Sequence, residues 1–185
     1  MKRFCLALAL LVAACGRTSG PVEVPAGELP FPVTRNVEPT GSPDSGSVYA
    51  VYLVRDDRLE MVNRRPEASL RPPEAVLRSL FEGPTRDERA RGIATRVPDG
   101  VRVLAVSVDD GDADVDLSAE FQEPAPPERI ALRIGQVVWT LTGLDSVRTV
   151  SFSIDGEPIS VTTDSGDHVE RRLTRKDYSD LAPRD

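Results

Sequence analysis

Residues 130–141 read IALRIGQVVWTL, and they carry the clearest structural signal in the chain. The apolar residues recur at the spacing of one helical face: Ile130, Ile134, Val137, Val138 and Leu141. This spacing predicts an amphipathic helix over 128–142, which Gly143 can end.

Strand and turn signals precede this helix. Residues 112–118 alternate between acidic and apolar side chains, which predicts a half-exposed strand. The turn Asp110-Gly111 joins it to a strand over 101–108. Following the helix, residues 147–154 form a further strand, which ends at a second Asp-Gly turn and has residues 159–162 as a short partner.

The earlier part of the domain repeats this plan. Residues 48–54 form a buried strand, and residues 58–64 return after Asp56-Asp57 with Leu59, Met61 and Asn63 on one side.

A first helix follows that hairpin. Pro72 suits its first turn, and Gly83 suits the position just after its end. Thr85 and Glu88 have the spacing of a capping box, which predicts a further short turn of helix to about Arg91.

The predicted order of elements is therefore ββαββαββ. This order favours an α+β fold, a mixed β-sheet with the two main helices packed on one face. The domain is predicted over 48–164. Residues 165–185 are polar and predict a C-terminal tail, in which Leu173 and Tyr178 contact the domain.

The first fifteen residues have the parts of a secretory signal peptide. Basic residues at the start are followed by an apolar stretch of 11 residues and then by Cys15. This stretch is shorter than the roughly 20 residues of a membrane-spanning helix. It resembles a bacterial lipobox, which implies cleavage after residue 14 and lipidation of Cys15. The other interpretation is an ordinary signal peptide with a chance cysteine near its end.

Lipidation would place the protein on the outer face of the cytoplasmic membrane, anchored by its N-terminal lipid. Residues 15–47 then form a Pro-, Gly- and Ser-rich tether. The formal charge of −7 argues against nucleic acid as a partner. Cys5 lies in the signal peptide and Cys15 would carry the lipid, so we expect no thiol metal site and no cofactor.

Several segments together resemble the GerMN domain of sporulation, germination and envelope proteins. The resemblance covers 48–178, and its segments are 51–54, 80–85 with Glu88, 97–101, 113–118 with Phe121, 136–142, 147–156 and 173–178. It implies a non-enzymatic, extracytoplasmic interaction module, similar in fold to ring-building motifs. The resemblance implies a lipoprotein of this family, of actinobacterial origin. Arginine far outnumbers lysine, which indicates a GC-rich genome.

The predicted function is docking to an envelope protein assembly, of the sporulation and germination type or associated with a sensor, or to a second copy of the chain. The alternative is a module that binds peptidoglycan or another wall polymer. A wall hydrolase is a third class, for which no nucleophile-elbow sequence is present.

Trp139 is the candidate interface residue, because exposed tryptophans often dominate binding energy. Arg133 and Arg148 could border such a patch, and the competing interpretation makes Trp139 a partly buried core residue. The single histidine, His168, is expected to be solvated rather than catalytic.

The acidic strand offers a possible cation site. Asp112, Asp114 and Asp116 point to one side of the strand, at a spacing of roughly 6.5–7 Å that is wide for one ion. We expect a solvated face there, with weak cation binding as the alternative. In a further interpretation, Asp116 and Ser118 accept hydrogen bonds from nearby backbone donors.

Overall fold

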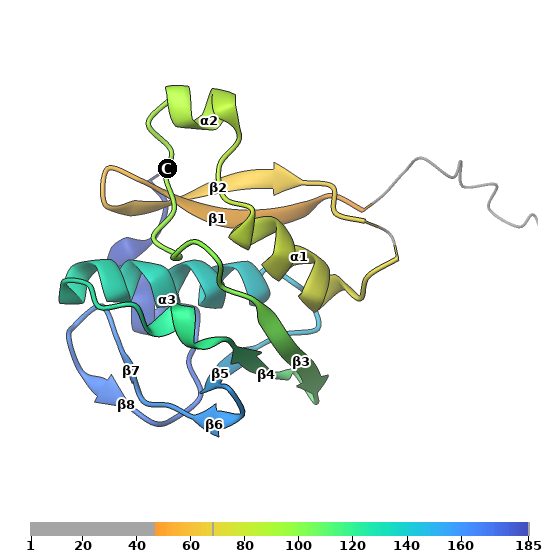
Figure 1. Cartoon of the computed structure of the whole chain (residues 1–185), viewed down its shortest axis with the longest axis vertical. Coiled ribbons are helices and arrows are strands. Elements are labelled where there is room, and N and C mark those ends of the chain that lie inside the picture. Colours follow the sequence, from red (N-terminus) through yellow and green to blue (C-terminus); the bar gives the residue numbers. More distant parts are fainter. Residues whose placement is uncertain (1–46, 68, 185) are drawn as a thin grey trace, which may run out of the picture. The chain divides into compact units, whose positions relative to one another are not determined.

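A computed structural model describes residues 47–67 and 69–184 (Figure 1). The predicted signal peptide, Cys15 and all but the last residue of the tether lie outside these residues. The strands form three sheets. The first sheet pairs β1 (Tyr49–Arg55) with β2 (Arg58–Arg64). The second has the order β3 (Val103–Asp109), β4 (Asp112–Leu117), β5 (Thr149–Ile154) and β6 (Glu157–Pro158), and the third pairs β7 (Val161–Thr162) with β8 (His168–Val169).

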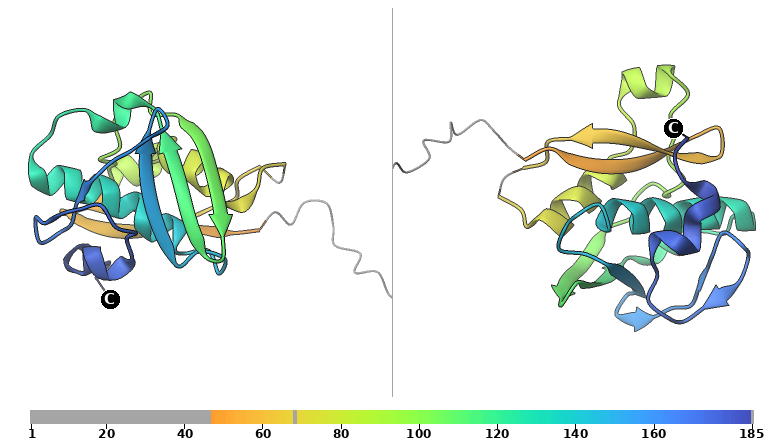
Figure 2. Two further views of the ribbon diagram at one scale, coloured as in Figure 1. Left: turned by 90° about the horizontal axis from the view of Figure 1, so that it is seen from below. Right: turned by 180° about the vertical axis from the view of Figure 1, so that it is seen from behind.

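The two main helices lie between the first two sheets. Helices α1 (Pro72–Phe81) and α3 (Pro127–Leu141) contact each other and the β1–β2 hairpin, while α1 also contacts β3 and α3 contacts β5 (Figure 1). Strands β3, β4 and β5 lie side by side (Figure 2, left). The predicted α+β class, with a mixed sheet and two main helices, is confirmed, and the hairpin adds a layer of its own.

The mixed character of the sheet follows from the path of the chain. Strand β3 pairs antiparallel with β4 through a two-residue turn, whereas β4 and β5 are parallel. Parallel neighbours need a crossover connection, and here η1 (Ala119–Gln122) and α3 supply it.

Local signals in the sequence are confirmed where they depend on turns and caps. All three two-residue turns have positive φ at both central residues, as this hairpin type requires: Asp56-Asp57, Asp110-Gly111 and Asp155-Gly156. Helix α1 ends before Gly83, whose φ is 71°. The capping box of Thr85 and Glu88 opens α2 (Arg86–Ala90) as predicted.

Two strand predictions need correction. Met61 is 53% exposed although it shares a side with the buried Leu59, while Val62 on the opposite side is buried. Residues 159–162 do not form one partner of β5, because β6 ends at Pro158 and Ile159 adds a single hydrogen bond to Phe152 O. The chain then leaves the sheet, and β7 pairs with β8 instead.

The segment predicted as a polar tail folds against the domain (Figure 2, right). Leu173 and Val150 exchange two backbone hydrogen bonds of 2.8 and 2.9 Å, which extends the edge of β5. Tyr178, in the turn-rich segment η2 (Arg175–Leu181), donates from its hydroxyl to Thr162 O at 2.9 Å. Leu173 and Tyr178 are fully buried, so the two predicted contacts are present and the surrounding residues are part of the domain.

Polar side chains of α3 hold the second edge of β1. Thr140 Oγ1 accepts from Tyr52 N at 3.0 Å, and Gln136 Nε2 donates to Tyr52 O at 3.1 Å. Gln136 Oε1 also accepts from Arg96 N at 2.8 Å. Both side chains are completely buried. Because a buried backbone group without a partner is costly, these two residues replace a missing neighbouring strand.

The substitution Gln136→Leu tests this role. It leaves Tyr52 O and Arg96 N without their partners inside the domain. We expect the free energy of unfolding to fall by about 2–4 kcal/mol, as measured by urea denaturation. Gln122→Leu, at an exposed position, is the matched control and should change stability by less than about 0.5 kcal/mol. Equal effects of the two substitutions would contradict the role given to Gln136.

Candidate functional site

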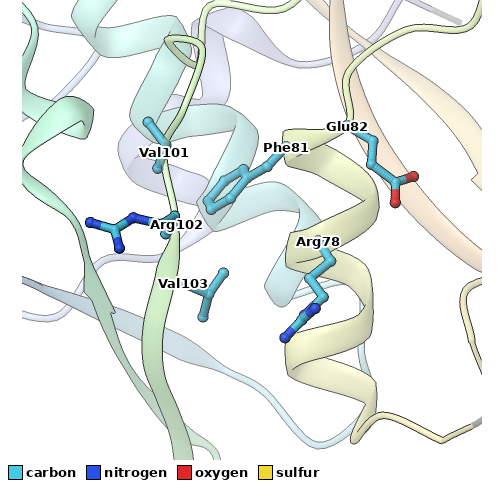
Figure 3. A pocket seen from close by; sticks show the side chains of 6 residues that line it. All are labelled: Arg78, Phe81, Glu82, Val101, Arg102 and Val103. Carbon is cyan, nitrogen blue, oxygen red and sulfur yellow. The ribbon is translucent and has the colours of Figure 1, made fainter.

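A groove of about 470 Å³ lies between the C-terminal half of α1 and the chain that enters β3 (Figure 3). It is lined by Arg78, Phe81, Glu82, Val101, Arg102 and Val103. In Figure 3 the ring of Phe81 projects from α1 toward the strand, and Val103 faces it from the other side. The groove therefore has an apolar floor with charged residues around it.

The charged residues differ in their direction. Arg78 reaches along α1 toward the open part of the groove, whereas Arg102 and Glu82 point away on opposite sides (Figure 3). Arg78 also pairs with Glu74 one turn earlier, at 2.9 Å, in an exposed salt bridge. An exposed pair of this kind is weak, so it leaves Arg78 able to meet another carboxylate.

Strand β3 beside the groove is the edge of the four-stranded sheet. Its pairing with β4 is irregular between Val103 and Ala105, and Leu104 at this irregularity is 43% exposed. Arg71 Nη2 donates to the outward carbonyl oxygen of Val106 at 3.3 Å. An edge strand offers unpaired backbone groups to another chain, and an irregular pairing and a positive side chain limit indiscriminate pairing.

A partly buried ion pair fixes the end of α1 that carries Phe81. Arg64 binds Glu88 through two hydrogen bonds of 2.6 and 2.7 Å, and the same guanidinium donates to Gly83 O at 3.3 Å. Glu88 Oε2 also accepts from Thr85 N at 2.8 Å. The hydrogen bonds from Arg64 lower the pKa of Glu88 from 4.5 to about 2, although burial opposes this shift. This network ties the start of α2 and the end of α1 to β2.

The acidic strand is occupied by groups of its own chain. Asp112 accepts from Thr149 Oγ1 at 2.7 Å, and Arg172 forms salt bridges with Asp112 at 3.5 Å and Asp114 at 3.0 Å. Asp114 also accepts from the hydroxyl of Ser151. Within residues 47–67 and 69–184, no three potential metal ligands gather at one place.

Two backbone-capping roles along this strand are confirmed. Asp116 Oδ1 accepts from Gly156 N at 3.0 Å, and Ser118 Oγ accepts from Arg102 N at 3.0 Å. The side chain of Asp116 thus closes the turn after β5.

The predicted interface residues do not form one patch. Trp139 is half-buried between Tyr52, with ring centroids 5.3 Å apart, and the guanidinium of Arg175, at 4.7 Å. Arg133 is only 5% exposed and binds backbone carbonyls. Arg148 is exposed beside the β3–β4 turn, where it pairs with Asp110 at 3.6 Å. Trp139 therefore fits the competing interpretation of a partly buried core residue.

His168 is exposed, and its Nδ1 lies 3.3 Å from Thr162 Oγ1. This agrees with the expectation of a solvated residue. The groove beside β3 was missed by sequence reasoning, which predicted only a helix that ends before Gly83 and a strand over 101–108. No periodicity marks such a groove, because it forms only where two elements pack.

Comparison with known proteins connects this fold to one family. The family model of Germane, described as "Sporulation and spore germination", matches residues 46–160. The chain belongs to this family. No curated protein matches the sequence significantly.

Two solved structures from Bacillus subtilis share the fold. The first GerMN domain of the sporulation protein GerM is 20% identical with a TM-score of 0.56, and the match covers 70% of this chain and 98% of that one. The tandem GerMN domains of the same protein are 21% identical with a TM-score of 0.57. That match covers 71% of this chain and 47% of the tandem structure, so the chain spans about half of it.

None of the helices in the described ranges has the length and hydrophobicity that a membrane span requires.

Acid should weaken the Arg64–Glu88 network and with it the fold. The pKa of Glu88 is lower in the folded protein than in the unfolded chain, so the ionised carboxylate stabilises the fold above about pH 4.5. This contribution is lost as the pH falls through about 2. We expect the free energy of unfolding to decrease between about pH 5 and 2, by on the order of 2–3 kcal/mol from this group.

Urea titrations at several pH values measure this dependence. Glu88→Gln should be less stable at neutral pH and should lose less stability on acidification. Glu82→Gln, an exposed change at the end of α1, should follow the parent protein. An unchanged acid dependence in Glu88→Gln would show that other carboxylates cause it.

Proposed function

We propose that this chain is a lipid-anchored lipoprotein on the outer face of the cytoplasmic membrane. Its Germane domain docks, without catalysis, onto an envelope protein assembly of the sporulation and germination type or associated with a sensor. The observation that carries this proposal is the groove with an apolar floor beside β3, whose outer edge is paired with no strand of the described residues. Family membership supports the setting, since the family is described by sporulation and spore germination.

The groove and the edge strand together fit a protein partner. An extended segment can add to an exposed sheet edge, where backbone hydrogen bonds give affinity and a side-chain pocket gives selectivity. Strand β3 supplies the edge, and the floor of Phe81 and Val103 supplies a pocket. Leu104 adds exposed apolar surface next to it.

Charge selects the kind of segment that fits. The chain as a whole is acidic, with a net charge of −7. Arg71, Arg78 and Arg102 nevertheless lie along this edge, against Glu82 and the paired Glu74. A partner segment with apolar and acidic side chains would complement the groove. Such complementarity mainly raises the rate and specificity of association.

The non-catalytic part of the proposal rests on how the polar residues are used. The acidic residues of β4 accept hydrogen bonds from Thr149, Ser151 and the backbone of the turn after β5, and they form salt bridges with Arg172. His168 is exposed on a short strand. A general acid or base must instead be held within hydrogen-bond distance of its substrate.

In vivo photocrosslinking tests the docking. A photoreactive residue at position 78, on the rim of the groove, should capture one defined membrane or wall-spanning protein. Leu104→Asp should reduce this capture severalfold, because it places a charge on the apolar contact surface. Met61→Asp is the matched control, since Met61 is a similarly exposed apolar residue on β2.

Three outcomes would contradict docking of an envelope protein assembly through the groove. Equal loss in both variants would show that the groove is not the contact. Capture of wall fragments alone would favour the alternative of a wall-polymer binding module. Capture of only a second copy of the chain would make the groove a self-association surface.

The anchor is tested separately. Cys15→Ser removes the proposed lipid acceptor, so we expect the folded protein to move from the membrane fraction to the soluble extracytoplasmic fraction. Metabolic labelling with a fatty acid analogue should mark the parent protein and not the variant. Unchanged membrane association of Cys15→Ser would mean that the lipid is not the anchor.

A further inference from the structure

A second cavity, of about 260 Å³, lies between the first half of α3 and the segment that contains β7. Its wall is mainly apolar and includes Phe121, Ile130, Ile134, Ile159 and Val161. Ligand pockets for drug-sized molecules measure about 300–1,000 Å³. This cavity therefore suits a smaller molecule with an aliphatic body.

Arg133 brings a positive charge to the cavity wall. Its Nε donates to Arg96 O at 3.1 Å, and its Nη1 donates to Phe121 O at 2.7 Å and Glu123 O at 2.9 Å. All three acceptors are neutral carbonyl groups. In the part of the chain that the structure describes, no carboxylate lies within 4.0 Å of this guanidinium.

A buried charge without a counter-charge is costly in a folded protein. Arg133 is only 5% exposed, and the groups that it contacts directly are neutral carbonyls. The charge of Glu123 acts on it from beyond salt-bridge distance. The three hydrogen bonds use Nε and Nη1, and a guanidinium has two further N–H donors on Nη2. Nη2 forms no hydrogen bond within the described residues, and Arg133 lines this cavity.

We propose that this cavity binds a small organic acid. The carboxylate would accept hydrogen bonds from Arg133 Nη2, because a guanidinium matches carboxylate geometry. The short aliphatic body would lie against Ile130, Ile134 and Val161. Such a ligand supplies both a negative charge in direct contact with Arg133 and the apolar surface that fills the cavity.

The proposal is independent of the docking function. The cavity shares no lining residue with the groove beside β3. Arg133 also borders a more polar depression that includes Thr95 and Arg129. A small inorganic anion would suit that depression, whereas an aliphatic acid needs the apolar cavity, and this difference can be measured.

The test is an NMR titration of the full-length chain with hexanoate. Saturable shifts are expected for amide signals around the cavity, including those of Ile134, Val161 and His168. Hexylamine has a similar aliphatic chain and the opposite charge. Inorganic phosphate has a negative charge and no aliphatic chain. Neither should produce these shifts. Saturation by hexylamine at equal concentration, or by phosphate alone, would overturn the proposal, as would the absence of saturable shifts with hexanoate.

Two variants locate the binding. Ser160→Trp fills the mouth of the cavity from an exposed position and should weaken hexanoate binding at least about tenfold. Ser107→Trp, on the exposed face of β3, is the matched control and should bind like the parent. Parent-like binding by Ser160→Trp would overturn the proposal.

Arg133→Gln removes the charge and should abolish the preference for hexanoate over hexylamine. Arg133 also donates hydrogen bonds to three backbone carbonyls, so the substitution could unfold the protein. The variant is therefore compared only under conditions where its thermal unfolding remains cooperative. If a folded Arg133→Gln protein still preferred hexanoate over hexylamine, the role given to the guanidinium would be overturned. The comparison of Ser160→Trp with Ser107→Trp tests whether hexanoate binds in the cavity, whatever the result for Arg133→Gln.

Discussion

The hydrogen bonds between α3 and the second edge of β1 are the constraint on which the rest of the domain depends. Among the described residues, strand β1 has a partner strand on one side only, so its other edge would carry buried backbone groups without partners. Gln136 and Thr140 satisfy Tyr52, and Ala94 exchanges two hydrogen bonds of 2.7 and 2.8 Å with Val54. Each unsatisfied buried group costs about 1–3 kcal/mol. The hydrogen bonds therefore fix both the rotation of α3 about its axis and its position along that axis relative to the hairpin.

This fixed position of α3 sets the place of the other elements. The apolar face of the helix packs into the main core with β4 and β5, which places the hairpin and the four-stranded sheet on opposite sides of the helix layer. Helix α1 fills the remaining space and is held at its end by Arg64 and Glu88. The groove beside β3 and the cavity beside β7 lie at the two borders of this helix layer, where packing is less complete.

Local features of the fold could be predicted from the sequence, whereas most features of the candidate sites could not. The capping box at Thr85 and the turn at Asp110-Gly111 were predicted correctly, because each depends on residues a few positions apart. Trp139 was placed at an interface because exposed tryptophans often dominate binding energy, and Arg133 was predicted to border the same patch. The structure buries Arg133 against three carbonyls that lie 10–37 positions away in sequence. No local sequence pattern indicates acceptors that lie so far away in the sequence, so the burial of Arg133 could not be predicted.

The sequence by itself determined the secondary structure and the order of elements as far as β5, and the α+β class, because periodicity, caps and turns are encoded by near neighbours. It also indicated that Leu173 and Tyr178 contact the domain, since they are large apolar and aromatic residues in a polar segment. Only the tertiary structure decided that this segment completes the edge of β5, that Met61 stays exposed and that Phe81 faces Val103 across a groove. These features arise from contacts between elements, where burial and hydrogen-bond satisfaction of the whole domain outweigh the preference of any one residue.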